Sequence, residues 1–253
     1  MVRMLLLRSL LFALFQVITV VPVALGCLVW AFFPLHVRYR LTMIWPRLSI
    51  WAGRVLCGMR YQVQGMENLP DGACIILSKH QSAWETLFYP CIMPRELCYV
   101  YKRELHYVPF FGWGIALLRM VHIDRARGMD AFESVVRQGG QRLAEGRWII
   151  MFPEGTRTPV GRPGRYKTGG PRLALRLGVP VVPIAHNAGE VWPRNSFIKK
   201  PGLITVSIGP VIASTGLTPE QLSSKVESWI ETEMRRISPH AYAHATTEVQ
   251  GTS

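Results

Sequence analysis

The stretch WIIMFPEGTRT, residues 148–158, joins an apolar run to a charged loop. Its first five residues are large and apolar, which is typical of a strand buried on both faces of a sheet. The loop that follows places Gly155, a residue that favours tight turns, between Glu154 and Arg157. A buried strand that ends in a charged loop is the arrangement with which open α/β sheets present ligand-binding groups.

Other apolar runs of strand length alternate with segments of helical length along the chain. The other predicted strands are 73–77, 97–100, 179–184 and 203–208. The predicted helices are 83–93, 129–144, 169–177 and 218–237. Because buried strands alternate with helices, we predict an α/β fold: a mixed, largely parallel sheet flanked by helices.

The segment SKHQSAWET, residues 78–86, supplies an imidazole and a carboxylate directly after a predicted strand. In one regular helix His80 and Glu85 would lie roughly 140° apart around the axis, so the backbone must turn between them if they interact. A loop carrying His80, followed by a helix that starts at Ser82, would direct the carboxylate back toward the ring. The pair would then be a general base oriented by an acid.

A structural role for Glu85 is the alternative, because Ser82 and Glu85 have the S-x-x-E spacing of a helix capping box. The two roles are compatible. One carboxylate oxygen would accept from the backbone while the other accepts from the His80 ring.

The two charged loops would meet if their strands are parallel, because parallel strands end at the same edge of a sheet. His80 and Arg157 would then face one cleft, where a guanidinium can grip a phosphate with two parallel hydrogen bonds. The alternative is a surface ion pair between Glu154 and Arg157. Further basic residues either extend the positive charge or form a solvated face; they are Arg162, Arg165, Lys167, Arg172 and Arg176.

The charge of the chain indicates anionic partners. Its formal net charge is +13, from 29 Lys plus Arg against 16 Asp plus Glu. Nucleic acid, phospholipid headgroups and phosphorylated substrates are all anionic and would be attracted to a chain with this net charge. Seven arginines precede the first acidic residue, Glu67, so the basic excess lies beside the most apolar part of the chain.

Residues 9–37 contain no Lys, Arg, Asp or Glu and are long enough to cross a hydrocarbon core of about 30 Å as a helix. A cleaved signal peptide is the alternative, but the apolar run continues past Cys27, beyond the need of such a peptide. Five arginines after the run against two before it would keep the following domain on the cytoplasmic side of the inner membrane. Pro22 and Pro34 leave open a kinked or re-entrant hairpin.

Arginines recur every seven residues after the apolar run, at positions 40, 47 and 54. Such a pattern predicts either a basic amphipathic helix at the headgroup boundary or an ordinary surface helix. The predicted organisation is a membrane anchor with this helix, a main domain and a loose C-terminal tail, which occupy residues 1–60, 61–238 and 239–253.

The sequence does not contain the motifs of several common types of functional site. The five cysteines are odd in number and have no C-x-x-C spacing, so neither a disulfide framework nor a zinc site is indicated. The phosphate-binding motifs G-x-x-x-x-G-K-[ST] and G-x-G-x-x-G do not occur. A serine hydrolase that uses Ser82 is an alternative enzyme class, but G-x-S-x-G is also missing.

Taken together, the motifs resemble those of the 1-acylglycerol-3-phosphate acyltransferases. SKHQSAWET is similar to the His-x4-acid block of that family, and FPEGTRT to its Phe-Pro-Glu-Gly-Thr-Arg block. The resemblance covers about residues 61–208, and the family usually has Asp where this chain has Glu85. Three further segments resemble the remaining blocks in family order: YKRELHYVPFFGWG (101–114), HIDR (122–125) and VPVVPIA (179–185).

The resemblance implies that His80, oriented by Glu85, deprotonates the free sn-2 hydroxyl of a lysophospholipid as it attacks an acyl thioester, which yields phosphatidic acid. The donor would be acyl-CoA or acyl carrier protein, with no metal or other cofactor. The partners would include membrane, with anionic lipid, and no nucleic acid. The implied substrate-binding residues are Glu154, Gly155, Thr156, Arg157, Lys102 and Arg125.

Two alternatives remain at this stage. The acceptor could be a different lysolipid, such as a lyso-aminolipid or lyso-glycolipid without the phosphate that Arg157 would bind. The chain could also be a non-catalytic basic module that binds membrane surfaces or nucleic acid, which would explain the charge but not the joint occurrence of His80, Glu85 and the EGTR loop.

Overall fold

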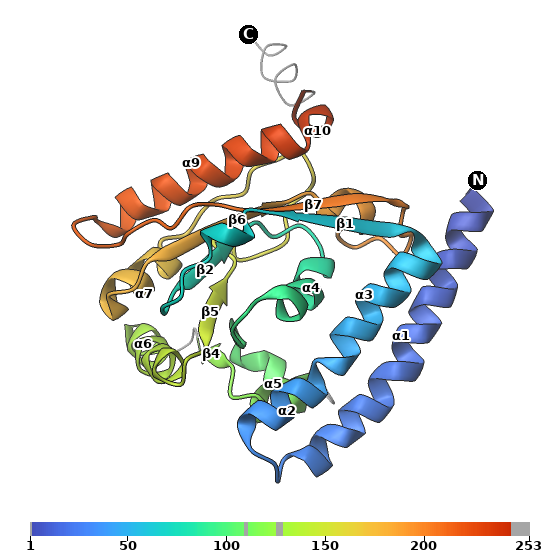
Figure 1. The fold of residues 1–253 in the computed structure, drawn as a ribbon, viewed down its shortest axis with the longest axis horizontal. Coiled ribbons are helices and arrows are strands. Elements are labelled where there is room, and N and C mark those ends of the chain that lie inside the picture. The colour runs from blue at the N-terminus through green and yellow to red at the C-terminus, as the bar shows by residue number, and fades with distance from the viewer. Residues whose placement is uncertain (1, 109–110, 125–128, 244–253) are drawn as a thin grey trace. The chain divides into compact units, whose positions relative to one another are not determined.

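A computed structural model describes residues 2–108, 111–124 and 129–243 of the chain. Strands alternate with helices after a helical N-terminal segment (Figure 1). The chain divides into two compact units, which are Met1–Cys57 with Thr86–Ile150, and Gly58–Glu85 with Met151–Ser253. The three-part organisation predicted from the sequence stays a prediction.

A helical hairpin opens the first unit. α1 (Val2–Trp30) is followed by α2 (Leu35–Thr42) and α3 (Ile44–Cys57), and α1 packs along α3 (Figure 1). Pro34 directly precedes α2, where its fixed φ suits the start of a helix. The predicted apolar segment 9–37 is therefore not one straight helix.

By length and composition, α1 is the helix of the described residues that could cross a membrane. Most of its large apolar side chains are exposed, and few of its residues are buried. The predicted amphipathic helix is divided in two, because Arg40 lies in α2 while Arg47 and Arg54 lie in α3.

Three parallel strands belong to the first unit. β3 (Leu97–Lys102) pairs with β5 (Trp148–Met151) on one side and with β4 (Val121–Ile123) on the other. α6 (Met129–Ala144) packs against β4. The remaining elements of this part of the chain are α4 (Trp84–Ile92), η2 (Arg103–Tyr107) and α5 (Phe111–Leu117).

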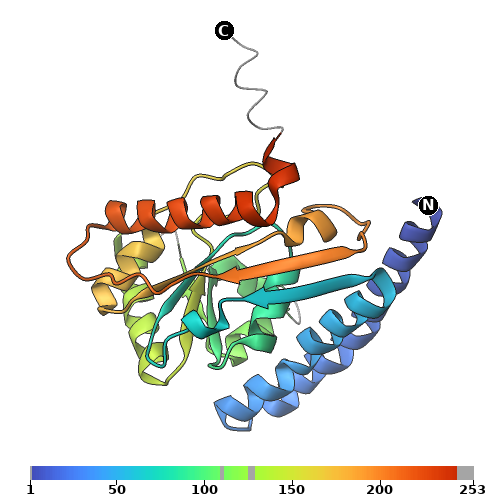
Figure 2. The same ribbon diagram turned by 45° about the horizontal axis from the view of Figure 1, so that its top comes forward.

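Four strands form the sheet of the second unit, in the order β1-β7-β6-β2. β1 (Met59–Gln64) lies parallel to β7 (Gly202–Ile208), as Figure 2 shows, and β2 (Ile75–Ser78) lies parallel to β6 (Val181–His186). Among the described strands of this unit, β6 and β7 form the antiparallel pair. β2 and β6 are buried throughout, as expected for strands with helices near both faces.

Helices cover this sheet. α9 (Pro219–Ile237) lies along β6 (Figure 1) and starts with a capping box at Thr218, whose hydroxyl accepts from the Gln221 amide. α7 (Gly169–Leu177) packs against β2 and α9. The shorter elements are η1 (Met66–Asn68), α8 (Ala188–Val191) and α10 (Pro239–Ala243).

The predicted α/β class, with a mixed and mostly parallel sheet, is confirmed. The sequence did not indicate β1, which is largely polar and exposed, or β4, which has only three residues. The start of the predicted loose tail is instead the helix α10, whose Tyr242 is buried. Residues 244–253 lie outside the described part of the chain.

Candidate active site

His80 lies in the loop between β2 and α4, where the sequence predicted a turn. Its Nδ1 is 2.8 Å from Oε1 of Glu85, so the imidazole and the carboxylate do meet. The ring also stacks on Phe152 of the FPEGTRT loop, with centroids 3.9 Å apart and planes 15° apart. Two independent contacts therefore fix the orientation of the ring.

Glu85 both caps its helix and orients the ring. Besides the His80 contact, its Oε1 accepts from the backbone amides of Gln81, at 3.0 Å, and Ser82, at 2.9 Å. The prediction that one oxygen accepts from the backbone and the other from the His80 ring is therefore wrong, because Oε1 accepts all three hydrogen bonds. Among the described residues Oε2 has no hydrogen-bond partner, although it is buried.

The contact with Glu85 determines the tautomer of neutral His80. A carboxylate can only accept a hydrogen bond, so Nδ1 carries the proton and Nε2 is left with its lone pair. No described residue hydrogen-bonds to Nε2, and the His80 side chain is 17% exposed. The arrangement presents one basic nitrogen to an incoming hydroxyl.

The ionised state of Glu85 is favoured. Burial alone would raise the pKa of this carboxyl, but the hydrogen bonds that it accepts from the His80 ring and the Ser82 amide favour its charged form, and the pKa is lowered. Glu85 is therefore a carboxylate that can stabilise the imidazolium formed when His80 takes a proton.

The FPEGTRT loop holds the backbone of His80 from both sides. The His80 amide donates to Oε2 of Glu154 at 3.0 Å, and the His80 carbonyl accepts from the Thr158 amide at 2.8 Å and from its hydroxyl at 3.2 Å. The prediction that the two loops meet is thus confirmed. Their contact is made through the backbone of His80.

Glu154 is buried and belongs to an ionic cluster. Its Oε1 lies 2.6 Å from Nζ of Lys79, which also lies 2.8 Å from Glu231. Burial beside Glu231 and Glu154 raises the pKa of Tyr166, so its hydroxyl stays protonated and donates to Glu231 at 2.9 Å. Removing one partner of a buried ion pair typically costs about 3–5 kcal/mol, so these charges depend on one another.

The alternative ion pair between Glu154 and Arg157 is wrong, because Glu154 pairs with Lys79. Gly155 has φ +69°, a left-handed angle that lets the loop turn without strain. Arg157 is half-buried, and no described carboxylate pairs with it. Thr156 is exposed on the same loop.

His186, at the end of β6, is a fully buried residue that the sequence did not single out. Its Nδ1 accepts from the Ala188 amide at 3.2 Å, and its Nε2 donates to the Lys79 carbonyl at 2.9 Å. The same Nε2 is 3.7 Å from Oε1 of Glu85. Burial lowers the pKa of His186 more than the neighbouring Glu85 raises it, so the ring is neutral and supports the backbone next to His80.

The lowered pKa of His186 predicts a loss of stability in mild acid. The unfolded chain binds a proton at this residue below about pH 6.5, whereas the folded chain resists it, so the free energy of unfolding falls as pH drops below that value. The loss is at most about 1.4 kcal/mol per pH unit. Urea unfolding in detergent at pH 7.5 and 5.5 should show a smaller loss for His186→Gln than for the wild type. An equal loss in both proteins would contradict a neutral His186.

The resemblance also implies roles for Lys102 and Arg125. Lys102 is the last residue of β3 and is exposed in the first unit, and Arg125 lies outside the described residues. Their role in binding a headgroup stays a prediction. The described residues contain no group of three or more His, Cys, Asp or Glu that could hold a metal ion.

Comparison with known proteins agrees with this geometry. A model of the acyltransferase family matches residues 60–187, just over half of the chain, so the chain belongs to the acyltransferase family. The crystal structure of the 1-acyl-sn-glycerophosphate acyltransferase PlsC from Thermotoga maritima has the same fold, with a TM-score of 0.74 and 23% identity. That match covers 92% of this chain and 95% of the other.

More similar relatives are 1-acyl-sn-glycerol-3-phosphate acyltransferases. The one from Pseudomonas aeruginosa is 47% identical over 210 residues, which cover 81% of this chain and 81% of that protein. The alpha form from Mus musculus is 28% identical over 185 residues, which cover 72% of this chain and 65% of that protein. The resemblance inferred from the motifs is therefore confirmed.

Proposed function

We propose that the chain transfers a fatty acyl group from a thioester to the sn-2 hydroxyl of 1-acylglycerol-3-phosphate. Nε2 of His80 takes the hydroxyl proton as the oxygen attacks the thioester carbonyl. The carbon–sulfur bond then breaks, and the imidazolium returns the proton to the departing thiolate. The observation that carries this proposal is the 2.8 Å contact between His80 and Glu85, which leaves Nε2 basic.

The transfer proceeds without an acyl-enzyme. Ser82, the alternative nucleophile, donates its hydroxyl hydrogen bond to the Trp192 carbonyl at 2.7 Å and accepts one from the Trp84 amide at 3.1 Å. Its oxygen therefore has a structural role in holding the loop. The acyl donor is acyl-CoA or acyl carrier protein, and the reaction uses no other cofactor. The product is phosphatidic acid, a precursor in phospholipid biosynthesis.

Arg157 binds the phosphate of the acceptor in this proposal. Its loop also holds the backbone of His80, so the charge that anchors the headgroup and the base that activates the hydroxyl are supported by one set of contacts. Gly155 and Thr156 shape the exposed turn. Glu154 holds the loop in place through its buried contacts with Lys79 and the His80 amide. Lys102 and Arg125 add positive charge.

The membrane is the site of the reaction. α1 is long and apolar enough to span it, and the excess of arginines after α1 supports an orientation with the catalytic domain on the cytoplasmic side of the inner membrane. The same arginines attract anionic lipid headgroups.

Replacing Arg157 by alanine is expected to raise the KM for lysophosphatidate at least tenfold, with a smaller change in kcat, because a guanidinium–phosphate contact is lost. Arg157→Lys should recover part of the loss, since an ammonium keeps the charge but not the paired hydrogen bonds. Phosphatidate formation by purified protein in detergent, at several acceptor concentrations, measures both effects.

Two controls belong to this experiment. Arg137→Ala removes an exposed arginine from α6 and should leave the KM unchanged. Monoacylglycerol, which lacks the phosphate, should be a poor acceptor for the wild type. Equal use of monoacylglycerol, or of a lyso-aminolipid, would show that the acceptor is a different lysolipid.

A further inference from the structure

Glu231 of α9 is a buried carboxylate that contacts both segments of the candidate active site. Its Oε1 accepts from Nζ of Lys79 at 2.8 Å and from the hydroxyl of Tyr166 at 2.9 Å. Lys79 directly precedes His80, and Tyr166 lies on the β5–α7 loop, residues 152–168, which includes FPEGTRT. One oxygen on α9 therefore joins the segment that carries the base to the loop that holds the backbone of that base.

Lys79 extends this connection to the backbone of His80. Its side chain is fully buried, and its Nζ is 2.8 Å from Oε1 of Glu231 and 2.6 Å from Oε1 of Glu154. The other oxygen of Glu154 accepts from the His80 amide at 3.0 Å. Because a buried charge must stay paired, a change at Glu231 moves the ammonium, and with it the carboxylate that holds the His80 amide.

The β5–α7 loop is closed around Glu154. Oε1 of Glu154 also accepts from the Gly164 amide at 3.1 Å, and a Cβ at Gly164 would lie 2.8 Å from that oxygen. The Lys167 amide donates to the Pro153 carbonyl at 2.9 Å, which joins the two ends of the loop. A contact that holds Tyr166 therefore also holds Glu154.

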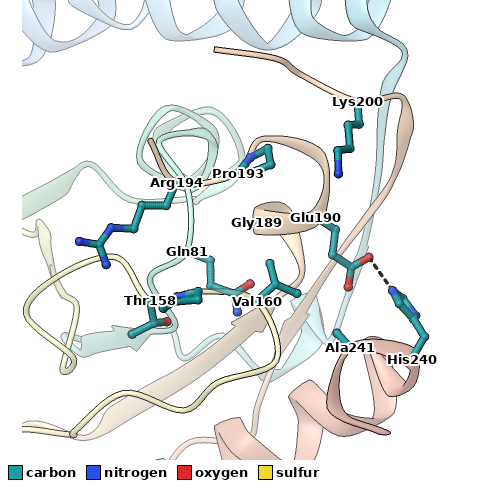
Figure 3. A pocket seen from close by; sticks show the side chains of 11 residues that line it. Gln81, Thr158, Val160, Gly189, Glu190, Pro193, Arg194, Lys200, His240 and Ala241 are labelled. Carbon is teal, nitrogen blue, oxygen red and sulfur yellow. Dashed lines mark ion pairs between the residues drawn. The ribbon is translucent and has the colours of Figure 1, made fainter. Parts of the chain in front are cut away.

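The C-terminal end of α9 is fixed by contacts of its own. The Ser238 hydroxyl donates to Glu190 of α8, and Nε2 of His240 on α10 lies 3.3 Å from the same carboxylate (Figure 3). α10 also lies against the β5–α7 loop, since a Cβ at Gly161 would clash with the Ala241 carbonyl oxygen. α9 is thus a fixed support from which Glu231 can hold the site.

We infer that Glu231 is a positioning residue for His80. It acts through Lys79 on one side and through Tyr166 on the other. The inference rests on the proposed acyl transfer and adds α9 to the parts of the fold that determine its rate. Residue 231 lies beyond residues 60–187, the part of the chain that the family model matches.

Variants of Glu231 and Tyr166 test this role. Glu231→Ala removes the shared oxygen and is expected to lower kcat, per folded enzyme, by about tenfold or more. Glu231→Gln keeps an oxygen at the same reach that can accept from both donors, so its kcat should stay within about threefold of the wild type. Tyr166→Phe removes one of the two contacts and keeps the packing of the ring, so an intermediate loss is expected. It answers the same question if Glu231→Ala does not fold.

Glu233→Ala is the matched control, because Glu233 is a carboxylate of the same helix that bonds to Arg236 and Ser207 instead. Its kcat per folded enzyme should equal that of the wild type. Wild-type kcat for Glu231→Ala and Tyr166→Phe, or an equal loss in Glu233→Ala, would overturn the inference.

Combination with His80→Ala distinguishes positioning from an independent effect on the rate. A residue that acts through His80 contributes nothing once the imidazole is gone. Glu231→Ala should therefore leave the residual kcat of His80→Ala unchanged within about twofold. Losses that multiply in the double variant would mean that Glu231 does not act through His80.

Hydrogen exchange tests the positioning without turnover. The His80 amide bonds to Glu154, and the Thr158 amide bonds to the His80 carbonyl, so both should be protected in the wild type. Glu231→Ala should speed their exchange by about tenfold or more, and Glu231→Gln should not. Amides of β1 and β7 should exchange at the wild-type rate in both variants.

Two results of the exchange experiment have different meanings. Faster exchange throughout the second unit in Glu231→Ala would show that Glu231 only stabilises the fold, and the inference would be wrong. If exchange is faster only around His80 and Thr158 while His80→Ala still acylates lysophosphatidate, Glu231 positions His80 as inferred, and the proposed base is wrong.

Discussion

Replacing His80 by alanine is expected to lower kcat by about 10²–10⁴-fold, the usual contribution of a positioned general base. The ring is held by Glu85 on one side and Phe152 on the other, so it acts from a fixed position. Its side chain is partly exposed, and alanine leaves both backbone contacts of residue 80 intact. Phosphatidate formation and the circular dichroism spectrum, measured on the same sample, check activity and folding together.

His36→Ala is the matched control, because His36 is an exposed histidine of α2 with no place in the site. It should keep wild-type turnover. Turnover by His80→Ala within a few-fold of the wild type would remove His80 from the chemistry.

Replacing Glu85 by glutamine is the second large effect, with an expected loss of about 10²–10⁴-fold in kcat. The amide has no charge with which to stabilise the imidazolium. Neither orientation of the glutamine amide suits the site. With its oxygen at the Oε1 position, the NH₂ group occupies the buried position of Oε2, which has no hydrogen-bond partner among the described residues. With the groups exchanged, NH₂ would face the amides of Gln81 and Ser82. A loss of stability of about 1–3 kcal/mol should accompany the loss of rate.

Glu85→Asp tests the charge of residue 85 separately from the length of its side chain. Aspartate is the usual residue of the family at this position and keeps the negative charge, so we expect Glu85→Asp to retain activity within about tenfold of the wild type. Steady-state rates of the two variants, each corrected for folded fraction, make the comparison. Equal rates for Glu85→Gln and Glu85→Asp would show that the charge of residue 85 does not matter.

The parts of the site that the sequence predicted are those that depend on short stretches of chain. The contact between His80 and Glu85 follows from a strand end, a loop and a helix start within nine residues. The meeting of the two loops follows from two apolar strands with charged ends. Both inferences needed only local patterns and the edge rule for parallel strands.

Partners from distant parts of the chain could not be predicted in this way. The Lys79 ammonium bonds to Glu231, which lies 152 residues further along on α9. His186 reaches the Lys79 carbonyl from β6. A lysine at the end of an apolar strand, and a histidine at the end of another, were signals of buried polar contacts, but their partners depend on tertiary packing.

The hydrogen-bond pattern of Glu85 was also beyond sequence reasoning. Spacing indicated that a cap and a ring contact were compatible, but not that one oxygen would make all three bonds. Similarly, the resemblance implied that Glu154 belongs to the substrate-binding loop, but not that its carboxylate would pair with Lys79 inside the fold. The direction of a side chain depends on neighbours that a linear pattern does not contain.

Thiol release in a rapid-mixing experiment tests the central claim most directly. It distinguishes a mechanism in which His80 acts as a general base from one in which the enzyme itself is acylated. Enzyme mixed with acyl-CoA or acyl carrier protein alone should release no burst of thiol. Adding lysophosphatidate should start release at one thiol per phosphatidate formed, and His80→Ala should abolish it. A burst equal to the enzyme concentration without any acceptor would mean that the chain itself takes the acyl group, and His80 would not be acting on the acceptor hydroxyl.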